Sequence, residues 1–241
     1  MSTRLRLFPL NAVLFPGANL NLHVFEPRYK QMLKDCLETG EGFGVILIRE
    51  GSEAGDAAAE PHEVGTIAQI ADVTELPFGR YYISTTGTQR FRIDRIVSRE
   101  PYLIVEAQML AGDDSAGPDD GDDLEDVAAQ VRELFDQYLQ LIVEFSGTVP
   151  VIEVPVDAQG VSFLVADALQ VADTMKQRLL ELKSTRQRLT VELGFLRRLL
   201  PQLHRLLERK KQQIASDNSE AEDDEFRDAQ ERYFGKYFSS N

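Results

Sequence analysis

The chain has 241 residues, of which 40 are acidic and 26 are basic, giving a formal charge of −14. This acidity argues against nucleic acid or an anionic membrane as the default partner. The single cysteine excludes an intramolecular disulfide and favours a reducing compartment. Because no apolar run is long enough to span a bilayer, we expect a cytoplasmic protein without a membrane partner.

The charge is concentrated in two short segments. Residues 111–126 hold eight acids and no base, and residues 216–241 hold eight acids and three bases. The stretch 111–123 has no large apolar side chain, so burial cannot offset the entropy of ordering it. We predict an acidic flexible linker there. We interpret 216–241 as an acidic tail whose late aromatic residues dock on the body or form a homodimer contact.

Residues 1–110 are predicted to form a β-rich lobe, because their apolar residues alternate with period two. One helix interrupts the strands: Pro27 suits the first helical position and Gly40 supplies the stop. Many short strands with one helix are typical of a partly closed barrel. The strands are expected near residues 5–7, 20–24, 43–48, 64–73, 81–86, 89–96 and 102–109.

Residues 124–215 are predicted to form an α-helical lobe, because the spacing of apolar residues changes to that of a helix. Pro201 falls inside the last helical pattern and should kink or break the helix at that point. The helices are expected near residues 127–145, 162–169, 174–182 and 184–200, with the last pattern continuing after the proline to about 215.

The sequence contains no motif of a familiar catalytic or metal site. It has no phosphate-binding glycine loop, no HExxH, no paired CxxC and no GxSxG. His23, His62 and His204 are far apart in the sequence, whereas metal ligands usually cluster. Cys36 lies on the apolar face of the predicted helix and is interpreted as a buried, unreactive thiol. We therefore expect no enzymatic activity, no metal and no cofactor.

Five ordered blocks of residues resemble the N-terminal domain of Lon protease. The first carries the opening signature from Phe8 to Gly17, and the second reads His-Val-Phe-Glu-Pro-Arg-Tyr from His23 onward. The resemblance covers roughly residues 5–200. The remaining blocks are 64–70, then 76–79 with 86–93, and finally 176–181 with Arg188 and Leu189.

The resemblance implies an α+β fold, in which a β-rich pseudo-barrel of the PUA-like type with one helix is followed by a C-terminal α-helical bundle. In full-length Lon this region contacts protein substrates, and ATPase and Ser–Lys peptidase modules follow it. Nothing in this sequence resembles those two modules. We therefore do not carry over ATP hydrolysis or peptide cleavage.

The leading hypothesis is a non-catalytic polypeptide-binding module, which acts alone or as an adaptor in protein quality control for a separate protease or chaperone. Its ligand would be an unfolded or extended polypeptide, held in a groove or paired with a strand edge. For Tyr81 and Tyr82 the alternative is packing in the core, because neighbouring residues on a strand face opposite ways. The predicted contact residues are Phe78, Tyr81 and Tyr82 near the hairpin, then Phe25, Arg28 and Tyr29.

Two other functions stay open at this point. PUA-like folds often bind RNA, although the β lobe lacks a basic stripe interleaved with aromatic residues. An ATP-independent peptidase is the remaining hypothesis, and the lack of a clustered nucleophile and base in the sequence argues against it.

Overall fold

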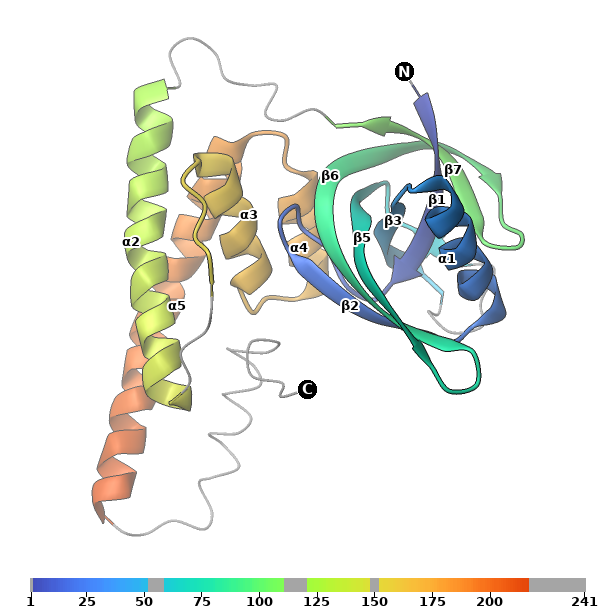
Figure 1. Cartoon of the computed structure of the whole chain (residues 1–241). Helices are drawn as coiled ribbons and strands as arrows, with labels where there is room; N and C mark the ends of the chain where they lie inside the picture. Colours follow the sequence, from blue (N-terminus) through green and yellow to red (C-terminus); the bar gives the residue numbers. More distant parts are fainter. Residues whose placement is uncertain (1, 52–58, 111–120, 148–151, 217–241) are drawn as a thin grey trace. The chain divides into compact units, whose positions relative to one another are not determined.

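The computed structural model describes residues 2–51, 59–110, 121–147 and 152–216. The described residues combine strands and helices, which confirms the predicted mixed fold (Figure 1). The chain divides into two compact units, Met1–Asp114 with Ala172–Leu182, and Ser115–Val171 with Lys183–Asn241. The strands are β1 (Ser2–Leu10), β2 (Asn19–Val24), β3 (Phe43–Glu50), β4 (Glu60–Pro61), β5 (Val64–Leu76), β6 (Arg80–Ser98) and β7 (Leu103–Met109). The helices are α1 (Pro27–Thr39), α2 (Gly121–Ser146), α3 (Ala158–Ala168), α4 (Asp173–Glu181) and α5 (Thr185–Ser216).

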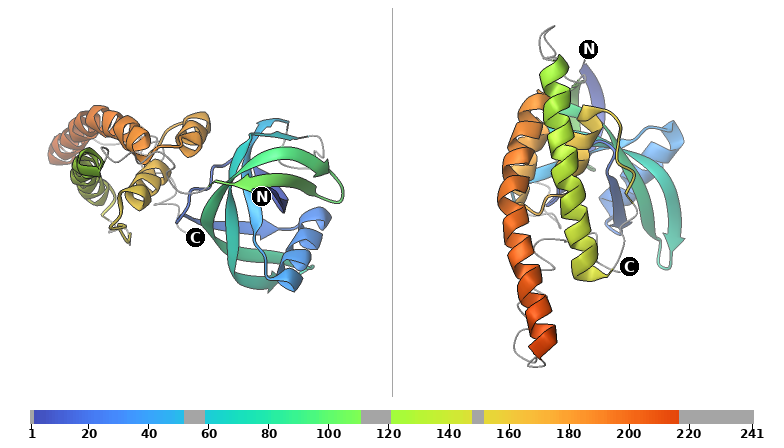
Figure 2. Two further views of the ribbon diagram at one scale, coloured as in Figure 1. Left: turned by 90° about the horizontal axis from the view of Figure 1, so that it is seen from above. Right: turned by 90° about the vertical axis from the view of Figure 1, so that its left-hand side faces the viewer.

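The sheet of the first unit closes on itself. Its strand order is β1-β7-β6-β5-β3-β4, and a parallel pairing of β1 with β3 completes a ring of β1, β7, β6, β5 and β3. The other ladders are antiparallel, and β2 pairs with β6 outside the ring. The left view of Figure 2 shows these strands curving round, with α1 at one side. Closure satisfies strand edges that would otherwise be exposed.

β6 is one long strand, where the sequence predicted two strands separated at Gly87. The chain passes Gly87 without ending the ladder, and the backbone N–H of Gly17 donates to its carbonyl oxygen at 2.8 Å. A Cβ at position 87 would lie 2.2 Å from the carbonyl oxygen of Phe15. Two stretches of backbone therefore approach closely at this glycine, which explains why no larger residue fits.

α1 forms where it was predicted. Pro27 occupies its first turn, and Gly40 ends it in the left-handed conformation with a φ of +69°. Met32, Leu33 and Cys36 are buried on the face that packs into the core of the unit. The opposite face of α1 is left to solvent, which makes it available as one wall of a surface site.

α4 belongs to the first unit, although the sequence analysis placed its residues in the helical lobe 124–215. Arg90 of β6 is 5% exposed and donates to the carbonyl oxygens of Leu180 and Leu182, both at 2.7 Å. Gln177 Nε2 donates to the carbonyl oxygen of Val64 at 2.9 Å. The Arg90 guanidinium thus satisfies carbonyl groups at the C-terminus of α4, where the helix dipole is negative. Apolar period predicts a helix but not the surface on which it packs.

In the second unit, α2 and α5 lie side by side (Figure 1, and Figure 2, right). α3 packs against both of them. Each long helix contributes one apolar stripe to a shared core, as the helical spacing predicted. The buried residues of these stripes include Val131, Phe135, Tyr138 and Ile142 of α2, and Leu189, Leu196, Leu200, Leu203 and Leu207 of α5.

Pro201 was predicted to kink or break the last helix, and it does not break it. α5 runs as a single helix from Thr185 to Ser216 with Pro201 inside it. Proline removes one backbone hydrogen bond from a helix. The leucines on either side of it, Leu200 and Leu203, are buried in the core. This packing holds the helix together across the missing bond, because tertiary burial contributes more to helix stability than propensity does.

Two predicted segments lie largely outside the described residues. Of the predicted acidic linker 111–123, only the last three residues are described, and they belong to the start of α2. Of the predicted tail 216–241, only Ser216 is described, as the last residue of α5.

Candidate functional site

A groove of about 620 Å³ opens at the surface of the first unit, between α1 and the start of β6. The solvent face of α1 supplies most of its lining, and Tyr81 supplies the part from β6. The lining mixes apolar surface with cationic groups, which is the chemistry of a binding surface. Its apolar residues are Pro27, Leu33, Leu37 and Tyr81, and its polar residues are Lys30, Gln31, Lys34 and Glu38.

The α1 wall of the groove is held in place from the core side. Cys36 is 1% exposed, and burial raises the pKa of its thiol to about 11, so it is protonated and inert at neutral pH. Asp35 accepts a hydrogen bond from the hydroxyl of Tyr102, and this bond holds the pKa of the Asp35 carboxyl below its usual range. Arg6 of β1 pairs with Glu41 at 2.8 Å, just beyond the end of α1.

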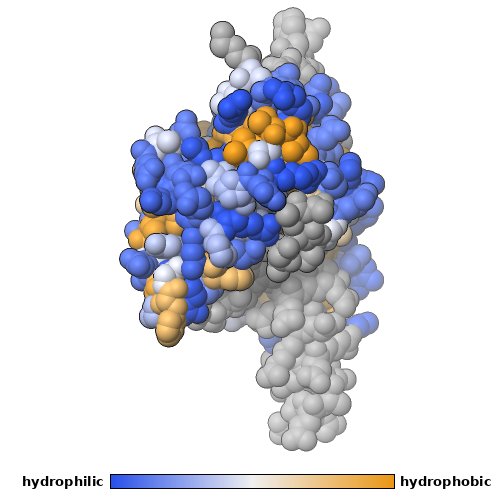
Figure 3. Space-filling model, turned by 90° about the vertical axis from the view of Figure 1, so that its right-hand side faces the viewer, coloured by the Kyte–Doolittle hydropathy of each residue, from blue (hydrophilic) through white to orange (hydrophobic). Residues whose placement is uncertain are grey.

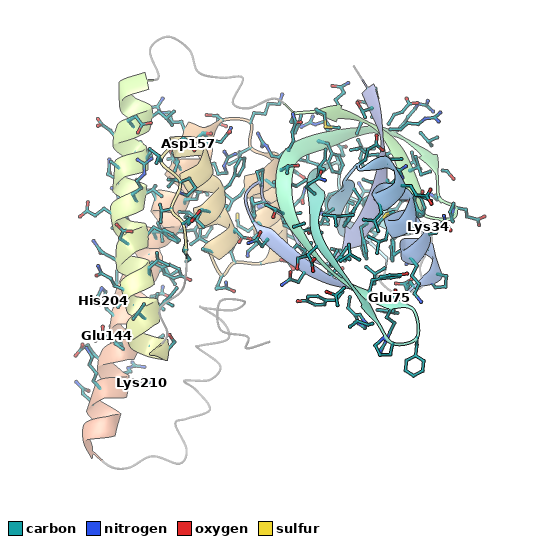
Figure 4. The ribbon with its side chains drawn as sticks, in the orientation of Figure 1. Lys34, Glu75, Glu144, Asp157, His204 and Lys210 are labelled. Carbon is teal, nitrogen blue, oxygen red and sulfur yellow. The ribbon has the colours of Figure 1, made fainter. Side chains whose placement is uncertain are left out.

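Positive charge borders the groove. Lys34 lies 3.9 Å from Glu38 one turn along α1, and Figure 4 labels Lys34 on α1 and Glu75 on β5. Lys30 reaches toward the hairpin that joins β5 and β6, because its Nζ lies 4.0 Å from the position a Cβ would take at Gly79. Within the described part of the chain, Lys30 has no carboxylate partner.

The hairpin tip carries an aromatic residue in an unusual conformation. Phe78 is 91% exposed and has a φ of +66°, the one positive φ of a non-glycine residue in the described ranges. Large side chains rarely adopt this conformation, because it costs roughly 1 kcal/mol or more. The Arg80 guanidinium lies 5.8 Å from the Phe78 ring centre and donates to the Pro77 carbonyl oxygen at 3.1 Å. A solvent-exposed aromatic held against its backbone preference is a candidate contact residue.

Tyr81 and Tyr82 point to opposite faces of β6. Tyr81 is the cross-strand neighbour of Val24, is half-buried and lines the groove. Tyr82 is the neighbour of His23 and is 37% exposed. The His23 ring lies 5.6 Å from the ring of Phe25, which is 54% exposed. The predicted residues Phe25 and Tyr82 therefore belong to a second surface, and Phe78 and Tyr81 belong to the hairpin and the groove.

Tyr29 is not available as a contact residue, which corrects the sequence prediction. It is 4% exposed and its ring stacks on Phe8 at 3.9 Å, because its position on α1 faces the core. Arg28 pairs with Glu26 at 3.0 Å and packs over the Tyr29 ring. Arg28 lines a separate cavity of only about 20 Å³, which is room for one water molecule.

Sequence reasoning missed the residues of α1 that line the groove. A charged helix face is ordinarily solvated, so Lys30 and Lys34 gave no reason to predict a binding site. By its spacing from Leu33, Leu37 belongs to the apolar stripe of α1, yet its side chain is 52% exposed. The position of Leu37 in the sequence could have indicated its exposure, because it is the last residue of that stripe. The core that buries Leu33 does not extend to it.

The face shown in Figure 3 carries separate apolar patches rather than one continuous apolar surface.

Among the described residues there is no cluster of three His, Cys, Asp or Glu side chains placed to hold a metal ion. No helix in the described ranges combines the length and apolarity of a membrane span.

The closed sheet, its flanking helix and the surface groove define a mixed α and β domain with a groove at its surface. Comparison with known proteins identifies the family. Residues 4–198 match the sequence model of the ATP-dependent protease La (LON) substrate-binding domain. The chain therefore belongs to the Lon substrate-binding domain family.

Similar proteins agree with this assignment. The chain is 27% identical over 196 residues to the Lon protease of Anaeromyxobacter dehalogenans and 26% identical over 196 residues to Lon protease 2 of Myxococcus xanthus. Each match covers 80% of this chain and 23% of the relative, so the chain spans about a quarter of these proteins.

Two solved structures share the fold. The Lon N-terminal domain protein from Xanthomonas campestris has a TM-score of 0.58 and 29% identity, covering 80% of this chain and 98% of that one. The N-terminal domain of Mycobacterium avium complex Lon protease has a TM-score of 0.57 and 16% identity over the same shares of the two chains. At this identity the second likeness concerns the fold alone.

Proposed function

We propose that this protein is a non-catalytic polypeptide-binding module, in which the groove between α1 and β6 holds an apolar segment of an unfolded or extended chain. Membership of a substrate-binding domain family supports a recognition role. The observation that carries the placement is the groove of about 620 Å³ beside Phe78, an exposed aromatic held at a φ of +66°.

The proposed contact residues are those of the groove and the adjoining tip, Phe78, Tyr81 and Leu37. Phe78 and Leu37 are exposed, so a ligand would remove apolar surface from water without any rearrangement of the core. Phe25 and Tyr82 form a second proposed contact surface on the other face of the hairpin. We further propose that the closed sheet is a PUA-like pseudo-barrel and that α2, α3 and α5 form a helical bundle.

In this proposal the protein acts in the cytoplasm as an adaptor that passes polypeptides to a separate protease or chaperone. The relatives named Lon protease support a link with proteolysis. The groove offers a peptide apolar contacts and cationic groups, both of which serve binding.

The test is titration of fluorescently labelled, unfolded β-casein into the full chain. We expect saturable binding with a Kd below the millimolar range. Phe78→Ser and Leu37→Ser each remove an exposed apolar contact and should weaken binding about tenfold, since burying such a side chain is worth about 1.5–3 kcal/mol.

The matched control is Val97→Ser, which also removes an exposed apolar side chain from β6 but does not line the groove. It should leave the affinity unchanged. No binding by the full chain up to about 1 mM, or equal loss in the Val97 variant, would contradict the proposal.

A further inference from the structure

The cations around the groove outnumber the carboxylates that neutralise them. Lys30 and Lys34 line it, and Arg80 lies in the adjoining hairpin, with its guanidinium 5.8 Å from the ring centre of Phe78. Glu38 is the one carboxylate among the lining residues, and its Oε1 lies 3.9 Å from Lys34 Nζ. Neither Lys30 nor Arg80 has a carboxylate within ion-pair distance among the residues that the structure describes.

Lys30 and Arg80 differ in this respect from several cations of the same unit. Elsewhere in the same unit, Arg6, Arg28 and Arg99 each pair with a glutamate at 3.0 Å or less. Cations that have no carboxylate partner and lie next to an apolar groove favour a ligand that carries negative charge.

The geometry places the charges at the margins of the apolar surface. Leu33 is 2% exposed and lies beneath the solvent face of α1, with Tyr81 facing it from β6. Lys30 lies on the hairpin side, as its distance of 4.0 Å from the Gly79 Cβ position shows. Glu75 of β5 is the cross-strand neighbour of Tyr81. It is the acidic residue of β5 that lies closest in the strand register to the hairpin side of the groove.

We propose that the groove selects apolar or aromatic segments flanked by acidic residues, and discriminates against the same segments flanked by basic residues. This inference rests on the proposed function and adds the class of polypeptide. The apolar centre of the segment packs on Leu37 and Tyr81. Its flanking carboxylates pair with Lys30, Lys34 and Arg80.

The expected selectivity follows from the exposure of these cations. An exposed ion pair changes an equilibrium by about 1.4- to 5-fold. Three such pairs, together with repulsion of basic flanks, give a preference on the order of tenfold for acidic flanks at low salt. The preference should shrink as salt rises, since a Debye length of about 8 Å at physiological ionic strength screens exposed charges.

The experiment uses the full chain and three synthetic probe peptides that share one apolar hexapeptide. The flanks are aspartates in the first peptide, lysines in the second and serines in the third, and binding is followed by fluorescence anisotropy. We expect the aspartate-flanked peptide to bind about tenfold more tightly than the lysine-flanked one, with the serine-flanked peptide between them.

Variants assign this preference to the groove. Lys30→Glu and Lys34→Glu together should abolish or reverse the order of the peptides, whereas Lys30→Arg should keep it. Arg49→Glu reverses an exposed charge of the same unit that does not line the groove, and should leave the order unchanged. Far-ultraviolet circular dichroism checks that each variant is folded.

The outcomes separate the two proposals. Equal binding of all three peptides would overturn the charge selectivity and leave polypeptide binding in place. Tighter binding of the lysine-flanked peptide, or persistence of the preference in the double lysine variant, would also overturn it. If neither the peptides nor casein bind, the proposed function itself is wrong.

Discussion

Glu192 of α5 shows how burial controls the chemistry of one side chain. It is fully buried, and loss of solvation raises the pKa of its carboxyl to about 8, against the opposing effect of the nearby Arg188. Ser162 donates a hydrogen bond to Glu192 at 3.0 Å and accepts one from Arg188 at 2.6 Å. The Arg188 guanidinium also lies 4.1 Å from the ring centre of Phe163. The cluster ties α3 to the first turns of α5.

The raised pKa of Glu192 predicts a pH dependence of stability. The unfolded carboxyl has a pKa near 4.5, so the folded state binds the proton more tightly. The stabilisation from this proton is complete below about pH 4.5 and is lost as the pH rises toward 8. In Glu192→Gln, which mimics the protonated acid, this fall should be absent when the free energy of unfolding is measured in urea between pH 5 and 8.

The control is Glu133→Gln, which removes an exposed carboxylate from α2. Its pH profile should run parallel to that of the unchanged protein. A Glu192→Gln profile that also runs parallel would show that the carboxyl is ionised throughout this range.

At the scale of single elements, Pro201 limits the stability of α5. It is exposed on a helix that continues for more than a dozen residues on either side of it. Pro201→Ala should restore a backbone hydrogen bond and raise the free energy of unfolding by up to about 3 kcal/mol. Thermal unfolding followed by circular dichroism at 222 nm measures the change.

The matched substitution is Gln202→Ala, at the next exposed position of the same helix, which should change stability by a few tenths of a kcal/mol. A Pro201→Ala variant no more stable than Gln202→Ala would mean that the helix already compensates for the missing bond.

Secondary structure was largely predictable from the sequence, and packing partners were not. The period-two spacing around Leu20 and Leu22 and the proline and glycine bounding α1 are local signals, and both elements formed. The surface on which an element packs is set by residues distant in sequence. Arg90 meets Leu180 across 90 residues, and no local pattern announces that contact. For the same reason the sequence predicted both Tyr29 and Tyr81 as contact residues, whereas Tyr29 faces the core and Tyr81 faces the groove.

At the scale of the whole molecule, the first unit is built from two separated stretches of chain. It needs Ala172–Leu182 because Arg90 and Gln177 join α4 to the sheet in buried hydrogen bonds. A fragment ending at residue 110 therefore leaves the Arg90 guanidinium without its two carbonyl acceptors. We predict that this fragment unfolds at a lower temperature than one in which α4 is supplied.

Adding a synthetic peptide of residues 170–184 to the fragment should raise its midpoint of thermal unfolding, because a ligand that binds the folded state stabilises it. The same peptide with Gln177→Ala should do so less well, since the Val64 carbonyl then loses its donor. If the fragment is equally stable with and without the peptide, α4 is dispensable for the sheet.

The late position of α4 also bears on synthesis of the chain at the ribosome. The last strand of the sheet ends at Met109, and α4 ends at Glu181, about 70 residues later. At roughly 5–20 residues per second, the sheet waits several seconds before the carbonyls that satisfy Arg90 exist. During that interval the guanidinium and the surface that α4 will cover are open to water and to other nascent chains. Completion of this unit thus depends on a helix that is translated after the whole of α2 and α3.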